Sequence, residues 1–421
     1  NRAMLRLPTE NTLDREEKTM AEWVERKISD IGTVVGGATP STKKPENYED
    51  GKIAWITPKD LSTFSGRYIE RGERNITEIG LKSCSTQLLP PNTVLFSSRA
   101  PIGYVAIAAN EVCTNQGFKS VIPNENTDPL FLFYLLKYNK DKIEGMGSGT
   151  TFKEVSGNTM KNIVVNVPTD KKVQEKIAAI LGSIDDKIEE NEQINNNLLQ
   201  QLDTLYDEFS HRKNWSTVII NDIAEKVAMG PFGSNIKVST FVSEGVPIIS
   251  GNHLRGYFLE EPSFNYITEE HAQRLKNSLV YPKDIVFTHA GNIGQVAMIP
   301  DDCRYPMYVL SQRQFYLRCD TEKAIPEYVV LFFHSKQGQH ELLSYANQTG
   351  VPSIAQPATN LKKIPLKLPP IDEQRQWLQV VSPIIKLYQS NVYENEHLSS
   401  MRDSLLPKLM SGELVVSDID L

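Results

Sequence analysis

The sequence predicts an α+β protein with two repeated, mostly β domains, each followed by a long helix. Three observations predict this class: an internal repeat, a coiled-coil pattern in each copy, and strand-like runs bounded by proline, glycine and asparagine. We expect recognition-type domains at 23–170 and 215–370 and helical spacers at 171–214 and 371–421. Residues 1–22 lie outside the repeat, as a peripheral leader or an appended remnant.

The repeat extends over most of the chain. Its first copy opens with WVERKISDIG at Trp23 and its second with WSTVIINDIA at Trp215, an offset of 192 residues. Near the ends of the copies, MKNIVVNVP at 160–168 matches LKKIPLKLP at 361–369, an offset of 201. Small insertions therefore lie in the loops between these matches.

Each copy contains both strand and helix signals. The runs TVLFSS, YVAIAA, DIVFTH and QFYLRC are rich in β-branched and aromatic residues and predict strands. The segments at 129–143 and 326–343 carry proline in the first turn and helical spacing afterwards. We therefore expect one packing helix in each domain.

Each spacer contains a coiled-coil seam. Positions 177 to 209 alternate steps of four and three, and adding 200 gives a second seam from 377 to 409. Both seams are apolar except at two matching asparagine positions and at Arg402. The residues expected to pair the helices are Ile184, Ile188, Asn191, Asn195 and Leu198 in the first and Ile384, Tyr388, Asn391, Asn395 and Leu398 in the second.

The asparagines predict how the helices pair. A polar seam residue costs stability but specifies register. In an antiparallel pair with a pseudo-twofold axis at the middle of the seam, Asn191 would face Asn395 and Asn195 would face Asn391. The alternative is that the asparagines lie on a solvated face. Their recurrence at the same repeat positions argues against it.

A helix-breaking signal recurs in each spacer, at 182–183 and at 382–383. Serine followed by proline is typical of a helix start, so we expect each spacer to hold a short helix and then a long one. The first long helix should cover about 183–211, a length of about 42 Å. The second should end near Leu406, because Pro407 cannot continue a helix.

Charge is distributed unevenly along the chain. The net charge is −7, but the segment 23–170 holds 17 Lys+Arg against 16 Asp+Glu, and 215–370 holds 14 against 14. The acidity lies in the spacers, with 6 against 9 in 171–214 and 4 against 8 in 371–421. Neutral domains can still carry local basic faces, for example around Arg67, whereas acidic helices suit protein partners better than DNA.

Cysteine spacing and hydropathy indicate the compartment. Cys84, Cys113, Cys303 and Cys319 are too widely spaced for a CxxC pair, which favours reduced thiols without a disulfide or a metal site. No run of 18 apolar residues occurs. We expect a cytoplasmic protein.

Catalytic motifs are incomplete in this sequence. It contains no GxxxxGK[ST] phosphate loop and no GxGxxG turn after a strand. His340 and Glu341 begin an HExxH-like string, but Ser344 stands where the second zinc ligand would be. We therefore predict no catalytic residue, metal or cofactor in this chain.

Polar loops remain, at corresponding positions of the two domains. Their Arg, Asn, Gln, His and Ser side chains can discriminate base edges, and Lys and Thr can bind phosphates. The alternative for any single residue is an ordinary turn residue. Two different polar sets on one repeated frame are what a reader of two different half-sites needs. The predicted DNA contacts are Thr39, Ser41, Thr42, Lys43, Lys59, Ser98, Arg99, Tyr104, Asn115, Gln116, Lys119, Phe232, Ser234, Asn252, His253, Arg255, Tyr257, His289, Asn292, Gln312, Arg313 and Gln314.

Four segments carry a family resemblance: GGATPSTK at 36–43, ILGSIDDKIEENEQINNNL at 180–198, LPPIDEQ at 368–374 and MRDSLLPKLMSGEL at 401–414. With them, the chain resembles the DNA-specificity subunit of type I restriction–modification systems. The resemblance implies two domains that each read half of a split, asymmetric DNA site. It also implies an antiparallel coiled coil that spaces the domains and docks two modification subunits.

The resemblance further implies where the chemistry lies. The modification subunits use S-adenosylmethionine to methylate adenine N6, and two restriction subunits, where a system retains them, use ATP and Mg²⁺. The specificity subunit itself is not catalytic. One departure is KKVQEK at 171–176, a poor copy of the DEQ sequence at 372–374, which puts equivalent docking of the two modification subunits in doubt.

Two other classes of protein remain as alternatives. A protein-interaction scaffold would bind protein through the repeated domains and would lack salt-sensitive DNA binding. An enzyme with an unfamiliar site would transfer methyl groups or cleave DNA by itself.

Overall fold

The computed structural model describes residues 22–149, 153–261, 263–347 and 350–416. Of the predicted leader at 1–22, only Glu22 is among them. Residues 150–152 of the GSGTTFK loop and 348–349 of the NQTGVPS loop also lie outside the described residues.

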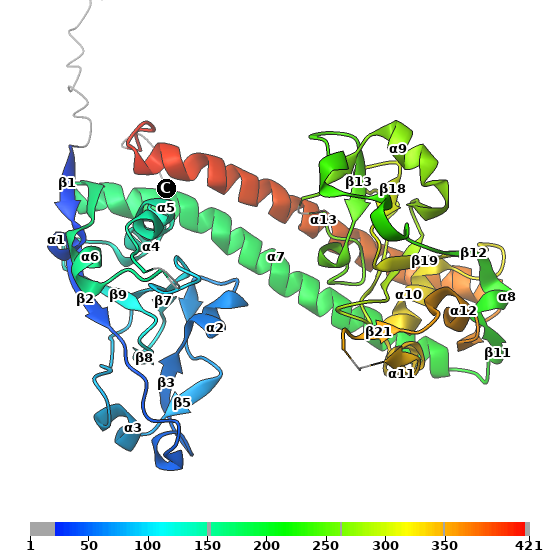
Figure 1. Ribbon diagram of the computed structural model, residues 1–421, viewed down its shortest axis with the longest axis horizontal. Helices are drawn as coiled ribbons and strands as arrows, with labels where there is room; N and C mark the ends of the chain where they lie inside the picture. The colour runs from blue at the N-terminus through cyan, green and yellow to red at the C-terminus, as the bar shows by residue number, and fades with distance from the viewer. Residues whose placement is uncertain (1–21, 150–152, 262, 348–349, 417–421) are drawn as a thin grey trace, which may run out of the picture. The chain divides into compact units, whose positions relative to one another are not determined.

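The chain divides into two compact units (Figure 1). Unit 1 comprises residues 1–190 and 397–421, and unit 2 comprises residues 191–396. Each unit therefore contains one repeat domain and part of each long helix. Among the described residues, no helix combines the length and the apolar character that crossing a membrane requires.

Unit 1 contains a five-stranded sheet, a three-stranded sheet and a two-stranded ribbon. The five-stranded sheet has the order β2 (Gly32–Gly36), β9 (Lys119–Pro123), β6 (Val94–Phe96), β7 (Val105–Ala108) and β4 (Tyr68–Ile69). The three-stranded sheet has the order β5 (Arg74–Ile76), β3 (Ile53–Ile56) and β8 (Val112–Thr114). The ribbon pairs β1 (Trp23–Lys27) with β10 (Val164–Pro168).

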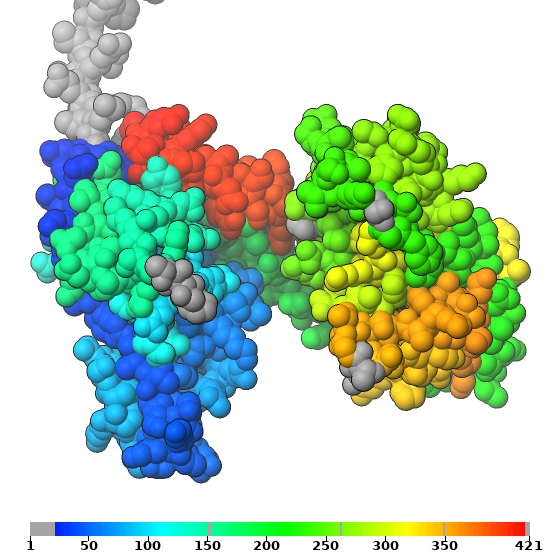
Figure 2. All heavy atoms as spheres, viewed as in Figure 1, coloured from blue at the N-terminus to red at the C-terminus, as the bar shows by residue number. Residues whose placement is uncertain are grey.

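The smaller sheet builds a separate lobe of unit 1. Figure 1 shows β3 and β5 with α3 (Glu78–Lys82) at the lower end of the unit, and Figure 2 shows the same lobe in blue and light blue. Its buried cluster contains Trp55, Ile76 and Cys113. The other short elements of unit 1 are α1 (Ile28–Ile31), η1 (Pro45–Asn47), α2 (Pro58–Ser62), α5 (Lys140–Gly145) and α6 (Gly157–Asn162).

The packing helix of unit 1 is α4 (Pro129–Tyr138), which lies against β6 and β7. It begins where predicted, with the Asp128 carboxylate accepting from the Phe131 amide at 2.7 Å. The predicted single helix is divided at Asn139, whose side-chain amide donates to the Leu135 carbonyl at 2.8 Å. An asparagine that binds the last turn in this way ends the helix, and α5 starts afresh.

Unit 2 repeats this arrangement with two four-stranded sheets. The first has the order β12 (Ala224–Met229), β19 (Gln314–Cys319), β16 (Ile285–Thr288) and β17 (Val296–Met298). The second has the order β14 (Tyr266–Ile267), β13 (Val246–Ile249), β18 (Tyr308–Leu310) and β15 (Leu279–Val280). Two ribbons pair β11 (Ser216–Ile219) with β22 (Pro365–Leu368) and β20 (Ala346–Asn347) with β21 (Ser353–Ile354).

The predicted packing helix of unit 2 also consists of two helices, α10 (Pro326–His334) and α11 (Lys336–Leu343). Ser335 separates them and caps α11, because its hydroxyl accepts from the Gly338 amide at 3.1 Å. The four strands predicted from sequence runs are β6, β7, β16 and β19. The remaining short elements are α8 (Ile220–Ile223), η2 (Gly233–Asn235), η3 (Val238–Thr240), η4 (Gly251–His253), α9 (Glu269–Arg274), η5 (Lys276–Ser278) and α12 (Pro357–Leu361).

Both spacers are single helices, so the predicted breaks were wrong. Helix α7 runs unbroken over Lys171–His211 and α13 over Ile371–Met410. Pro383 and Pro407 lie on exposed positions of α13, so a carbonyl that loses its helical partner can bind water instead. On the opposite face Val381 and Ile385 are buried, and tertiary packing of this face outweighs the local signal.

The two helices pair antiparallel, as the seam predicts. In unit 2, the Asn191 side-chain amide donates to Asn395 at 2.9 Å, and the Asn391 amide donates to Asn195 at 2.9 Å. Asn191 also donates to Glu394 at 2.8 Å. These are the two asparagine pairs that the repeat predicts. The fold class is therefore confirmed: mixed α and β domains accompany an antiparallel pair of long helices.

Apolar seam residues surround these pairs. In unit 2, Leu198 and Tyr388 are buried, and Ile384 is half-buried. In unit 1, Ile184 is buried, whereas Ile188 and Leu398 are half-buried.

In each unit, a side chain of the domain forms hydrogen bonds to the part of α7 that belongs to that unit. In unit 1, buried Arg67 donates to Asp186, to Glu189 at 3.0 Å and to the Gly182 carbonyl at 3.3 Å. Arg67 therefore belongs to this joint and not to an exposed basic face. In unit 2, the Tyr257 hydroxyl donates to both carboxylate oxygens of Asp203, at 2.8 and 2.9 Å.

Candidate nucleic-acid interface

The predicted polar loops of unit 1 are joined by backbone hydrogen bonds. Ala38 donates to the Thr114 carbonyl at 3.0 Å, which ties the first loop to the turn after β8. Ser98 donates to the Gly117 carbonyl at 2.7 Å, and Val155 donates to the Ser98 carbonyl at 2.9 Å. Loops that are distant in sequence therefore form one cluster, which we call loop cluster 1.

Unit 2 repeats the last two of these connections in loop cluster 2, while its first loop is tied by the Gly230 amide, which donates to the Gln314 carbonyl at 2.8 Å. His289 donates to the Arg313 carbonyl at 2.9 Å, as Ser98 does to Gly117. Ile354 donates to the His289 carbonyl at 2.8 Å, as Val155 does to Ser98. The main chain thus holds the turns at Ser98 and His289 in the same way in both units, while several side chains at equivalent positions differ.

In each cluster, the first loop packs closely against a neighbouring turn at a glycine. A Cβ at Gly37 would lie 2.2 Å from the Asn115 carbonyl oxygen, and a Cβ at Gly230 would lie 2.0 Å from that of Ser311. No side chain is tolerated at such a distance, so glycine is needed for this close approach. The two glycines mark equivalent positions of the repeat, 193 residues apart.

Loop cluster 1 exposes hydroxyl, amide and basic groups. Thr39 and Gln116 are exposed and hydrogen-bonded to each other. Asn115 shapes the turn instead, because its side-chain oxygen accepts from the Gly117 amide at 2.8 Å. Tyr104 is half-buried against the core. The exposed predicted contacts on the loop after Thr39 are Ser41, Thr42 and Lys43.

Acidic side chains pair with three of the predicted basic contacts of unit 1. Glu154 pairs with Arg99 at 2.9 Å and with Lys119 at 3.6 Å. Lys59 pairs with Glu73 at 2.7 Å, and hydrogen bonding to that carboxylate raises the lysine pKa. Sequence reasoning missed Glu154, which directly follows the GSGTTFK loop. In the sequence, the sign of its role was a single carboxylate next to a predicted polar loop.

Loop cluster 2 combines polar side chains with an exposed aromatic ring. Phe232 is 74% exposed, and Gln312, Arg313 and Asn292 are exposed as well. The His289 ring is half-buried with its Nε2 3.1 Å from the Gln312 carbonyl, and burial lowers its pKa. Asn252 and Arg255 are exposed on the adjoining segment. Ser234 lies in η2, and only its backbone is described.

Four predicted contacts belong to the fold instead, which corrects the sequence interpretation. Ser98 and Gln314 are buried at 0% and 1% exposure. His253 is buried, with Nδ1 accepting from the Ser250 amide at 2.9 Å and Nε2 lying 2.8 Å from the Ser263 carbonyl. The Tyr257 ring stacks on His334, 3.9 Å between centroids. Because these side chains are buried, stacked or hydrogen-bonded within the fold, they are not available to contact a base.

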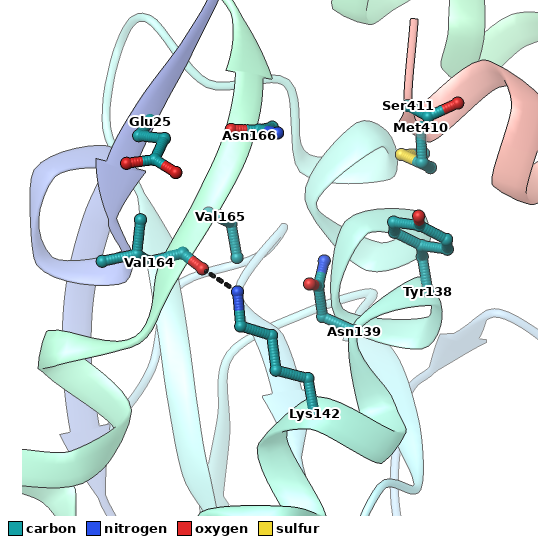
Figure 3. Close-up of a pocket in the computed structure, with 9 residues that line it drawn as sticks. All are labelled: Glu25, Tyr138, Asn139, Lys142, Val164, Val165, Asn166, Met410 and Ser411. Atoms are coloured by element: carbon teal, nitrogen blue, oxygen red, sulfur yellow. Dashed lines mark hydrogen bonds between the residues drawn. The ribbon is translucent and has the colours of Figure 1, made fainter. Parts of the chain in front are cut away.

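Hollows also lie outside the loop clusters, one in each unit being of interest. The unit 1 cavity, about 420 Å³, lies where β1, β10, α4, α5 and α13 meet, and in it the Lys142 amine donates to the Val164 carbonyl at 2.6 Å (Figure 3). The unit 2 groove, about 520 Å³, lies between α7 and α13 and is lined by Leu205, Glu208, Phe209, Arg212, Glu373, Gln376, Trp377 and Val380.

Within the described part of the chain, His, Cys, Asp and Glu side chains form no group of three or more that could hold a metal ion. All four cysteines are free thiols, and burial raises the pKa of Cys113 to about 11. A thiol with a raised pKa is a poor nucleophile at neutral pH.

A family model described as the type I restriction modification DNA specificity domain matches this chain twice, over residues 20–200 and 212–398. The chain belongs to this specificity family. The MjaIX specificity subunit of a type I restriction enzyme from Methanocaldococcus jannaschii is 31% identical, over 96% of each chain. The EcoR124I/EcoR124II specificity subunit from Escherichia coli is 29% identical over 39% of this chain and 41% of that protein.

Solved structures agree with the fold of this specificity family. The S subunit of a type I restriction–modification system from M. genitalium superposes with a TM-score of 0.56 at 16% identity, over 94% of this chain and 97% of that one. At this level of sequence identity the likeness shows the fold alone. The resemblance inferred from four sequence segments is thus confirmed.

Proposed function

We propose that this chain is the DNA-reading subunit of a type I restriction–modification complex. Each domain, at 23–170 and 215–370, reads one half of a bipartite asymmetric site through its loop cluster. One observation carries this proposal: equivalent backbone hydrogen bonds and equivalent close-packed glycines hold both clusters, yet exposed Thr39 in one corresponds to exposed Phe232 in the other. A common frame with different exposed side chains suits two different half-sites.

The electrostatics support reading of the bases in addition to attraction to the phosphates. Arg99 and Lys119 share Glu154, so their charge is partly neutralised before DNA arrives. The domains are nearly neutral overall. Affinity must therefore depend on local contacts and shape more than on a large positive field.

The helices serve as spacer and docking surface in this proposal. Two modification subunits would bind α7 and α13, and two restriction subunits would join where the system retains them. The acidic composition of both spacers supports a protein partner there. The groove of unit 2 between Phe209 and Val380 adds exposed apolar surface. In this role the chain does no chemistry, and S-adenosylmethionine, ATP and Mg²⁺ belong to its partners.

Methylation mapping tests this function. The chain is expressed with its modification partner in cells that lack adenine methylation, and N6-methyladenine is mapped across the genome. We expect a split motif with two fixed halves and an unspecified spacer. Replacing residues 23–168 by the corresponding domain of a relative should change one half of the motif and leave the other intact.

A protein-interaction scaffold is the alternative outcome. A stable complex with an active partner that methylates no defined motif would contradict the proposed function. Binding of the purified complex to duplexes containing the site should also weaken steeply as salt increases. Binding that ignores both sequence and salt would favour the scaffold.

A further inference from the structure

Phe232 is the most exposed aromatic side chain among the large hydrophobic residues of the described chain, at 74%. It lies between Gly230, which is held against the Ser311 carbonyl, and Gly233, whose φ is +61°. The loop is fixed on both sides, because the Gly230 amide donates to the Gln314 carbonyl at 2.8 Å and Gln312 donates to the Gly233 carbonyl. A single exposed ring is common on protein surfaces; what marks Phe232 is its place on a loop that is tethered into loop cluster 2.

The equivalent position in unit 1 is Thr39. Gly37 and Gly230 correspond in their close approach to the next loop, and the residues two positions later are Thr39 and Phe232. The turns correspond as well, since Phe118 donates to Asn115 and Gln314 donates to Ser311, both at 3.3 Å. Gln116 and Gln312, one position into each turn, are therefore equivalent. Each cluster thus pairs an exposed glutamine with its first loop, and only unit 2 places an aromatic ring beside it.

The anchor of Gln312 fixes the orientation of its amide. A backbone carbonyl only accepts hydrogen bonds, so the amide must turn its NH₂ group toward Gly233. Its side-chain oxygen then lies at the other end of the amide, on an exposed residue. Beside Phe232, loop cluster 2 consequently offers one hydrogen-bond acceptor and one apolar face.

We propose that Phe232 and Gln312 together read an adenine–thymine base pair in the major groove of the half-site assigned to unit 2. On that edge adenine N6 supplies a donor and thymine supplies the C5 methyl group, so one base pair satisfies both groups. A guanine–cytosine pair supplies an amine but no methyl group. Phe232 covers the thymine methyl, and the Gln312 oxygen accepts from adenine N6. This assignment rests on the proposed DNA-reading function.

Removal of single groups from the DNA tests the proposal. Once methylation mapping has defined the site, each thymine of the unit 2 half is replaced in turn by deoxyuridine, which lacks only the methyl group. For the full chain with its modification partner, we expect one such replacement to weaken binding roughly fourfold, the effect of burying one methylene-sized group. In Phe232→Ala, that replacement should change nothing further. Phe232→Leu should restore the penalty, because an apolar side chain still meets the methyl.

The adenine of the same pair tests Gln312. Replacing it by purine, which lacks the N6 amine, should weaken wild-type binding roughly three- to tenfold, and should have no additional effect in Gln312→Leu. Val238→Ala is the matched control, because Val238 is 81% exposed and lies outside the loop connections that hold Phe232. This control should keep both penalties.

The outcomes separate this proposal from the broader one. A mapped split site at which no thymine replacement matters, or a Phe232→Ala variant that keeps the full penalty, overturns the reading by Phe232 and leaves the DNA-reading function standing. Absence of any methylated motif overturns the function itself. Since Phe232 contributes to no buried cluster, its variants should fold as the wild type does.

Discussion

Unit 1 and unit 2 join their domains to the helices at equivalent positions with opposite chemistry. In unit 1, the buried Asp185 carboxylate accepts from the Tyr134 hydroxyl at 2.6 Å and from Arg402 at 2.7 Å. The equivalent residues in unit 2, at the seam offset of 200, are Ile385 and Leu202, both buried and apolar. A charged pair in one unit thus corresponds to hydrocarbon in the other.

The difference shows that one helix geometry can be sustained by either kind of contact. A buried ion pair gains little net stability, but its partners must be present together. If α7 paired with a copy of itself, Asp185 would lie opposite Leu202, without its cation. The contact between Asp185 and Arg402 therefore distinguishes α7 from α13 at a position where the apolar seams of the two helices are otherwise alike.

Trp377→Ala should give the largest loss, because it opens the apolar joint of unit 2. The indole is stacked on Phe209 at 5.6 Å between centroids and packs edge-on against Tyr328. Truncation should cost about 4 kcal/mol of unfolding free energy, as a lost buried aromatic side chain does. Hydrogen exchange of unit 2 peptides measures it, with the exposed Val380→Ala as the control near zero. Equal protection in the two variants would contradict this packing role.

Asp185→Ala should cost about 3 kcal/mol in unit 1, since it leaves Arg402 and Tyr134 without their acceptor. The matched double variant Asp185→Ile with Arg402→Leu installs the residues of unit 2. It should recover the part of the loss that comes from unpaired Arg402, because an apolar pair avoids burying charge, while the Tyr134 hydroxyl still lacks its acceptor. Denaturant unfolding at low and high salt measures the stability of both variants. If the double variant is no more stable than Asp185→Ala, then side-chain shape, and not charge, is what distinguishes the contacts of the two units.

Acid should weaken unit 2 through His334, whose pKa burial lowers to about 4. The unfolded residue has a pKa of about 6.5, so the unfolded state binds the proton more readily, and stability present above that value is lost as pH falls toward 4. Between about pH 6 and 4.5 the loss should reach about 2 kcal/mol. Hydrogen exchange of unit 2 peptides across this range should show a shallower slope in His334→Gln. If the wild type and His334→Gln lose protection equally as the pH falls, other groups cause the acid sensitivity.

Asn391→Ala should give the smallest effect, about 1 kcal/mol, because Asn195 loses one hydrogen bond and keeps its bond to the Tyr388 carbonyl at 3.3 Å. Replacing both Asn195 and Asn391 by leucine should raise the unfolding temperature and weaken control of register. Disulfide trapping with cysteines at 191 and 395 reports that register. A double variant that traps as uniquely as the wild type would remove the register role.

The sequence predicted what repeats and missed what is particular to one unit. The seam and its asparagine pairs follow from a period that both copies share. The continuous helices did not, because Pro383 reads as a break until its exposed position and the buried face opposite are known. Local pattern alone could not outweigh that packing.

The candidate site shows the same limit. The repeat correctly indicated which loops correspond, but not which side chains turn inward. His253 resembles a loop donor until its bonds to Ser250 and Ser263 are seen. Arg67 reads as part of a basic face, although its acceptors lie 115 to 122 residues away in the sequence. Burial and distant pairing require the fold.

The backbone connections of the loop clusters have a consequence for evolution. Because main-chain atoms of Ser98 and His289 hold neighbouring loops, the exposed residues between them carry little of the folding free energy. If Gln116 and Phe232 contact bases as proposed, substitutions there can alter what is read at little cost to stability. Single substitutions in these loops could therefore change the DNA target without a change in the fold of the domain.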